Sequence, residues 1–208
     1  MTSAVQNSTS ADYTEVPFVV RSGTILGLLQ SVLVFAFSLA SRLLEGTPEL
    51  IVRAIIVVFG LAATSLLPGI WTRARRIEGI AGAAGIGLMA TAVYLLVDSL
   101  LLQHIGTYTD RWLAIGGGSN WWYHPVWWMA GTYLSWMGAW ALANQADRGG
   151  ASPLMALITA LVLTIIVGAL AVVIGVPLAG WNLGTFAVAF LVGIALTVLV
   201  TGLGGKRP

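Results

Sequence analysis

Residues 153–176 read PLMALITALVLTIIVGALAVVIGV, an apolar run without a single charged side chain. About 20 consecutive apolar residues are enough to cross the hydrocarbon core of a bilayer as an α-helix. Five further runs of this kind occupy residues 23–41, 51–71, 79–103, 125–144 and 183–203. The sequence therefore predicts an all-α protein, a polytopic membrane bundle of about six transmembrane helices.

The composition of the whole chain agrees with this class. Hydrophobic residues make up 58% and charged residues 9%, whereas soluble domains average roughly 25% charged residues. The formal net charge is only +2 and the basic residues are scattered, so lipids, and not nucleic acid, are the expected partner. The chain has no Cys, which excludes thiolate metal sites, iron–sulfur clusters and covalently attached haem.

The chain divides into a short polar head and one membrane domain. Residues 1–17 are rich in Ser, Thr and Asn and lack an apolar core, which predicts a disordered N-terminal head and no signal peptide. Residues 18–208 are expected to form a single six-helix domain. Its one long connection is a Trp-rich loop at 104–124.

The distribution of basic residues predicts how the domain is oriented in the cell membrane. The run from Trp71 to Arg76 holds three arginines and is assigned to the cytoplasmic side. Three basic residues then lie outside: Arg42, Arg53 and Arg111. The other seven lie inside: Arg21, Arg73, Arg75, Arg76, Arg148, Lys206 and Arg207. Both termini are therefore predicted to be cytoplasmic, and the loop at 104–124 external.

Small residues predict which helix faces pack closely, because close approach of backbones drives helix association in lipid. The third span begins with a glycine- and alanine-rich segment at 79–87. One face of the fourth span carries Gly131, Ser135, Gly138 and Leu142, and the opposite face carries Met129, Tyr133, Trp136 and Trp140. The small face is expected to meet neighbouring helices. For the aromatic face, lipid or core packing, a subunit contact and a bound planar ligand are the alternatives.

A dense aromatic cluster precedes and opens the fourth span. Its members are Trp121, Trp122, Tyr123, Trp127 and Trp128. Indole rings favour the headgroup layer, so an interfacial belt is the simplest interpretation. The glycine-rich segment at 115–120 leaves open a lid or a docking surface for a partner, since exposed aromatic clusters mark interaction sites.

Asp98 is the one ionisable residue set well inside a predicted span. Burying a charge at the bilayer centre costs about 2.5–3.5 kcal/mol or more. Thr91 and Tyr94 lie on the same helix face and are the expected hydrogen-bond partners, with Gln30 and Arg111 as further candidates. A locally satisfied carboxylate and a proton- or cation-handling group are the two alternatives.

His104 and His124 lie at the ends of consecutive spans, at similar predicted depth. Together with Asp98 they are candidate ligands for a metal ion, and the two imidazoles alone for a haem iron. Asp98 and His104 are about 240° apart around a regular helix, so they share a face only if the helix breaks. The alternative is that both imidazoles are satisfied by loop backbone or water.

Three functions are consistent with these residues. The first is a non-catalytic subunit of a larger membrane complex, of respiratory, photosynthetic or oxygenase type, which contacts other membrane subunits or a second copy through the aromatic face and the outer loop. The second is a redox or oxygenase component that binds a metal, haem or quinone near the two histidines. The third is a small proton- or cation-coupled transporter that uses Asp98. No hydrolase motif is present, so an enzyme acting on its own is not expected.

Overall fold

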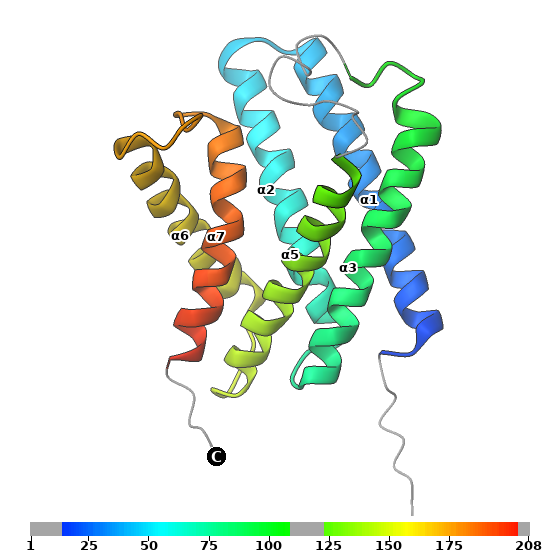
Figure 1. Ribbon diagram of the computed structural model, residues 1–208, viewed down its shortest axis with the longest axis vertical. Helices are drawn as coiled ribbons and strands as arrows, with labels where there is room; N and C mark the ends of the chain where they lie inside the picture. The colour runs from blue at the N-terminus through cyan, green and yellow to red at the C-terminus, as the bar shows by residue number, and fades with distance from the viewer. Residues whose placement is uncertain (1–13, 109–122, 204–208) are drawn as a thin grey trace, which may run out of the picture.

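A computed structural model describes residues 14–108 and 123–203 of the chain. Six long helices form an all-helical bundle (Figure 1), which confirms the predicted fold class. The elements are α1 (Val16–Leu43), α2 (Gly46–Trp71), α3 (Ile77–Val97), the short π-helix η1 (Asp98–Leu102), α5 (Tyr123–Ala146), α6 (Pro153–Val173) and α7 (Leu183–Gly202).

Five of these helices are long and apolar enough to cross a membrane: α1, α2, α3 with η1, α6 and α7. The remaining helix, α5, has 24 residues and corresponds to the predicted fourth span. Its Trp, Tyr, Asn and Gln side chains make it less apolar than the others. It packs against α2, α3 and α7.

The helices run alternately up and down (Figure 1), so α1 begins and α7 ends at the same end of the bundle. We call this the termini end and the opposite one the far end. The turn between α1 and α2 lies at the far end, as do η1, the start of α5 and the connection between α6 and α7. The start of α1 and the end of α7 therefore lie on the same side of the bundle. This agrees with the prediction that both termini are on one side of the membrane.

Helix α1 begins at Val16, inside the segment that the sequence assigns to the polar head. Pro17 stands in its first turn, where the missing N–H is not needed and the fixed φ angle favours helix. The remainder of the predicted head, up to residue 13, lies outside the described residues. Most of the predicted outer loop, residues 109–122, also lies outside them.

Contacts between small residues bring α5 close to α2 and α3. A Cβ atom on Gly138 would overlap the carbonyl oxygen of Ser65 in α2, and a Cβ atom on Gly131 would overlap the hydroxyl of Thr91 in α3. The hydroxyl of Ser135, fully buried between these glycines, donates a hydrogen bond of 2.8 Å to the carbonyl of Thr64. The predicted packing role of this face of α5 is confirmed.

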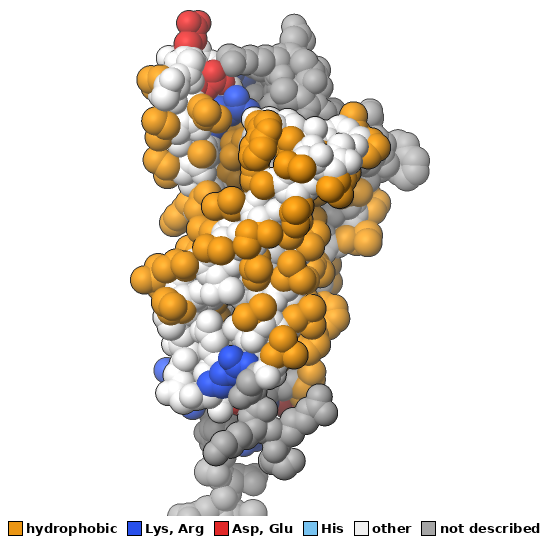
Figure 2. Space-filling view, turned by 90° about the vertical axis from the view of Figure 1, so that its left-hand side faces the viewer, with side chains coloured by type: hydrophobic (Ala, Val, Ile, Leu, Met, Phe, Trp, Pro, Cys, Tyr) orange, Lys and Arg blue, Asp and Glu red, His pale blue; other side chains and the backbone are white. Residues whose placement is uncertain are grey.

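The outer surface has the pattern expected of a bundle that lies in lipid. Hydrophobic side chains cover the middle of the face shown in Figure 2, and charged side chains gather at its two ends. Many large apolar side chains on α6 are exposed, among them Val162, Ile165 and Ile166. An apolar surface of this extent is stable in hydrocarbon but not in water.

Candidate functional site

A central cavity of about 290 Å³ lies among α1, α2, α3 and α5, with one residue of α7 on its wall. Most of its lining is apolar. Four polar side chains of the described residues also face it: Gln30, Thr64, Thr91 and Tyr94. The cavity combines an apolar wall with a few polar groups, as small-molecule sites do.

The polar groups of the cavity are arranged around one hydrogen bond between helices. The side-chain amide of Gln30 in α1 donates to the hydroxyl oxygen of Thr64 in α2 over 3.0 Å. Thr91 donates its hydroxyl to the carbonyl of Gly87, one turn earlier in α3, over 2.9 Å. Gln30 therefore bonds to Thr64 and not to Asp98, contrary to one expectation from the sequence.

Asp98 stands at the far end of α3, where it is almost fully buried, with 1% of its surface exposed. The side-chain amide of Gln103 donates to one carboxylate oxygen over 2.9 Å, and the hydroxyl of Tyr108 donates to the other. The hydroxyl of Tyr94 lies 3.5 Å from that of Tyr108. Tyr94 thus reaches Asp98 through Tyr108, and the predicted direct bonds from Thr91 or Tyr94 are wrong.

The π-helix η1 explains this difference. Residues 98–102 leave the α-helical hydrogen-bond pattern, and the backbone N–H of Gln103 bonds to the carbonyl of Asp98, five residues earlier, over 3.0 Å. A π-turn widens the helix and shifts the following side chains around its axis. Asp98 itself still follows the α-helical pattern, because its backbone N–H bonds to the carbonyl of Tyr94. The change of periodicity affects the residues after it, and the partners of its carboxylate, Gln103 and Tyr108, come from there.

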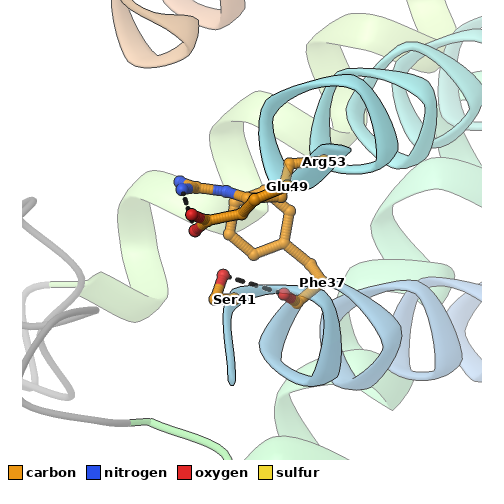
Figure 3. Close-up of polar contacts among 4 residues, drawn as sticks. All are labelled: Phe37, Ser41, Glu49 and Arg53. Atoms are coloured by element: carbon orange, nitrogen blue, oxygen red, sulfur yellow. Dashed lines mark hydrogen bonds and ion pairs between the residues drawn. The ribbon is translucent and has the colours of Figure 1, made fainter. Parts of the chain in front are cut away.

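A second polar cluster at the far end was not singled out from the sequence. Figure 3 shows the guanidinium group of Arg53 beside the carboxylate of Glu49 and over the ring of Phe37. The N···O distance of the ion pair is 3.0 Å, and the guanidinium carbon lies 4.6 Å from the ring centroid. The relevant sequence signal was the spacing of an acid four residues before a base on one helix.

This ion pair is mostly shielded from solvent. The side chain of Glu49 is 5% exposed and that of Arg53 is 18% exposed. The Nε atom of Arg53 is buried and has no hydrogen-bond partner among the described residues. Phe37 also lines the central cavity. The pair therefore packs on the outer side of one cavity wall, while Tyr94 connects another wall with the Asp98 cluster.

The predicted aromatic face of α5 is divided between two environments. Tyr133 is partly buried and donates its hydroxyl to the carbonyl of Leu191 in α7 over 2.8 Å. Trp136 and Trp140 are 43% and 40% exposed, and their rings are stacked, with centroids 6.1 Å apart and planes inclined by 19°. Met129 is 73% exposed. The outward part of the face therefore consists of Met129 and the stacked tryptophan pair.

The tryptophans at the start of α5 differ in position. Trp127 lines the cavity and packs edge-on against Tyr94, with ring centroids 6.2 Å apart. Its neighbour Trp128 is 48% exposed. Trp121 and Trp122 lie outside the described residues.

The candidate metal ligands are only partly described. His104 is exposed beyond η1, whereas Asp98 is buried and already bonded to Gln103 and Tyr108. The side chain of His124 lies outside the described part of the chain. Among the side chains that are described, no three His, Cys, Asp or Glu residues gather in a way that could hold a metal ion. The metal or haem site remains a prediction.

The chemistry available in the central cavity is hydrogen bonding and aromatic contact. Amide, hydroxyl and phenol groups on its walls can orient a ligand, and Trp127 and Phe37 offer flat apolar surfaces. Comparison of the chain with protein-family models, with curated proteins and with solved structures finds no match.

Proposed function

We propose that this chain is a non-catalytic integral membrane subunit that joins a larger membrane complex through the aromatic face of α5. The observation that supports the proposal is the exposed, stacked pair Trp136 and Trp140. Exposure of an apolar side chain to lipid is ordinary in a membrane protein. An indole also carries an N–H donor, however, and this donor needs an acceptor wherever the ring lies away from water.

The depth of the pair follows from the length of the helix. At 1.5 Å per residue, the 24 residues of α5 span about 36 Å, slightly more than the hydrocarbon core of about 30 Å. Trp136 lies about 20 Å from the beginning of the helix, within roughly 3 Å of its middle. Trp140 follows one turn later. Both rings are therefore expected at the depth of the acyl chains and not in the headgroup layer.

An indole N–H at this depth needs a hydrogen-bond acceptor that lipid tails do not supply. Within residues 14–108 and 123–203, neither Trp136 nor Trp140 has a hydrogen-bond partner. On the same face, the hydroxyl of Tyr133 donates a hydrogen bond to the carbonyl of Leu191 in α7. We therefore propose that a transmembrane helix of another protein covers the tryptophan pair and offers acceptors of the same kind.

The proposal includes the orientation of the chain in the cell membrane. The termini end is placed in the cytoplasm, because most basic residues lie there and the arginine-rich turn after α2 belongs to it. The chain has no Cys, so single-cysteine variants give a clean test. In intact cells a membrane-impermeant maleimide should label Gly106→Cys at the far end and leave Arg148→Cys unlabelled. The opposite labelling pattern would reverse the orientation.

The subunit role is tested by isolating the protein from its native membrane in mild detergent. Mass spectrometry should find a second protein in fixed ratio with the wild type. The double variant Trp136→Ala/Trp140→Ala should lose this protein, because truncation removes both the contact area and the two donors. Replacement of both residues by Phe should weaken the association less, since it removes the N–H groups and keeps most of the apolar surface.

A matched control is Ile165→Ala/Ile166→Ala on α6, which removes two exposed apolar side chains at a similar distance from the helix ends. This variant should keep the partner. Light scattering of the purified protein distinguishes a foreign partner from a second copy. If the wild type runs as a lone monomer in mild detergent and in lipid nanodiscs, the proposed subunit role is wrong.

The redox and transport hypotheses are not advanced further. The first depends on His124, whose side chain lies outside the described residues, and the second on Asp98, whose carboxylate accepts hydrogen bonds from Gln103 and Tyr108. They remain predictions from the sequence.

A further inference from the structure

The central cavity contains hydrogen-bonding capacity that the fold itself does not use. Gln30 donates to the hydroxyl oxygen of Thr64. Among the described residues, the carbonyl oxygen of the Gln30 amide accepts no hydrogen bond and the hydroxyl proton of Thr64 reaches no acceptor. One acceptor and one donor thus stand side by side on the cavity wall.

These two groups lie far from the headgroup layers. Gln30 is 14 residues from the start of α1 and 13 from its end, which places it about 20 Å from either end of the helix. A polar group in hydrocarbon without a partner costs several kcal/mol. A molecule that enters the cavity and satisfies both groups gains this energy, whereas an acyl chain leaves them unpaired.

A single hydroxyl group fits the pair best. It can donate its proton to the carbonyl oxygen of Gln30 and accept the proton of Thr64 on its own oxygen. A ketone or quinone carbonyl only accepts, so it would leave the oxygen of Gln30 without a donor. The arrangement of donor and acceptor therefore selects an alcohol or a phenol over a carbonyl compound.

The remaining walls indicate an aromatic ring. Phe37, Tyr94 and Trp127 line the same cavity, and aromatic side chains favour offset or edge-on contacts with a flat ring. The volume of about 290 Å³ is at the lower limit of the roughly 300–1,000 Å³ of sites that hold drug-sized ligands. It suits one substituted ring and is too small for a macrocycle.

We propose that the central cavity binds a lipid-soluble molecule of the phenol or hydroquinone class, with its ring hydroxyl held between Gln30 and Thr64. This inference goes beyond the subunit role and does not depend on it, because the cavity and the tryptophan pair use different residues. No chemical change of the ligand is implied. The site recognises a hydroxyl group in an apolar, aromatic setting.

The test uses the full chain in lipid nanodiscs and two probes that differ only in a hydroxyl group. Thymol carries the hydroxyl, and para-cymene is the same hydrocarbon without it. Equilibrium dialysis of labelled probe, corrected with empty nanodiscs for partition into lipid, should show one saturable thymol site per chain. Para-cymene should bind about tenfold more weakly, the equivalent of one well-made hydrogen bond.

Variants assign the binding to the cavity. Gln30→Leu and Thr64→Val each remove one hydrogen-bonding group at similar volume and should move thymol affinity toward that of para-cymene, with para-cymene binding unchanged. Gly60 lines the cavity and has room for a Cβ atom, the nearest atom being 3.5 Å away. Gly60→Leu should therefore fill the space and abolish binding of both probes. Thr159→Val on α6, where the hydroxyl bonds to the carbonyl of Met155 in its own helix, is the matched control and should bind like the wild type.

Several outcomes would overturn the proposal. Equal affinity for thymol and para-cymene would show an apolar cavity without hydroxyl recognition. An absence of saturable binding above empty nanodiscs would mean that water or lipid occupies the space. Equal weakening by Thr64→Val and Thr159→Val would show that the effect is not local to the cavity. Circular dichroism of each variant checks that a lost site is not a lost fold.

Discussion

Alanine at position 138 would place a methyl group where α5 touches the backbone of α2. The Cβ atom would overlap the carbonyl oxygen of Ser65. A backbone carbonyl within a helix cannot rotate away as the end of a flexible side chain can. The two helices must therefore separate, and the variant Gly138→Ala is expected to be less stable than the wild type.

The size of the effect follows from the required separation. Ordinary contact begins at 3.4 Å, so α2 and α5 must move apart by about 1 Å or more. A gap of this size forfeits about a quarter to a half of each contact, and each contact is worth about 0.1–0.2 kcal/mol. About 40 contacts, as many as one buried leucine makes, then cost roughly 1–4 kcal/mol. Alanine returns about 1 kcal/mol as the better helix former, which leaves a net loss of roughly 0–3 kcal/mol.

The assay is titration of the purified protein in mixed micelles with sodium dodecyl sulfate, followed by circular dichroism. The matched control is Gly85→Ala in α3, where the new Cβ atom would lie 3.5 Å from the nearest side-chain atom, in Val19, at ordinary contact distance. Gly85→Ala should unfold at the same detergent fraction as the wild type or at a higher one. If Gly138→Ala proves as stable as Gly85→Ala, the close packing of α2 on α5 does not have the energetic role argued above.

Three further changes can be followed with the same unfolding titration. Tyr108→Phe removes a donor from the buried carboxylate of Asp98 and should lower the free energy of unfolding by about 1–3 kcal/mol; Asp98→Asn should partly suppress that difference if the bond is its cause. Glu49→Leu leaves the largely buried Arg53 without its acid and should cost about 2–3 kcal/mol, less than a fully buried pair would. The double variant Glu49→Leu/Arg53→Leu should recover most of this loss of stability. If the losses of the two single variants simply add in the double variant, the two side chains are not coupled. Asn144→Leu removes a donor to a carbonyl of α7 and should cost about 1 kcal/mol, with faster amide hydrogen exchange at the termini end of α7; unchanged exchange would show that the bond does not tie the two helices.

Helical periodicity was a good guide where the helices are regular. It identified the face of α5 that contains Ser135 and Gly138, because side chains three and four residues apart share a face for the whole length of an α-helix. The same rule did not identify the partners of Asp98, since Gln103 and Tyr108 follow the π-helix that begins there, and that helix has a different periodicity. Nothing in the run Asp98–Leu102 marks the change, because its leucines are compatible with either form of helix.

The central cavity was outside the reach of sequence reasoning for a different reason. Its hydrogen bond joins Gln30 to Thr64, 34 residues apart, and a single sequence carries no record of which helices are neighbours. The stacked pair Trp136 and Trp140 was identified as part of a face. Its exposure depends on which side of α5 the other helices leave uncovered.

The sequence by itself determined that this protein is a bundle of membrane-length helices and which helix surfaces can approach closely, because length, hydrophobicity and the size of side chains are local properties of the chain. Only the tertiary structure decided that Asp98 is held by Gln103 and Tyr108, that Glu49 and Arg53 pack on Phe37, and that a cavity remains between the helices. These features depend on the relative placement of several helices, and that placement results from the packing of all of them together.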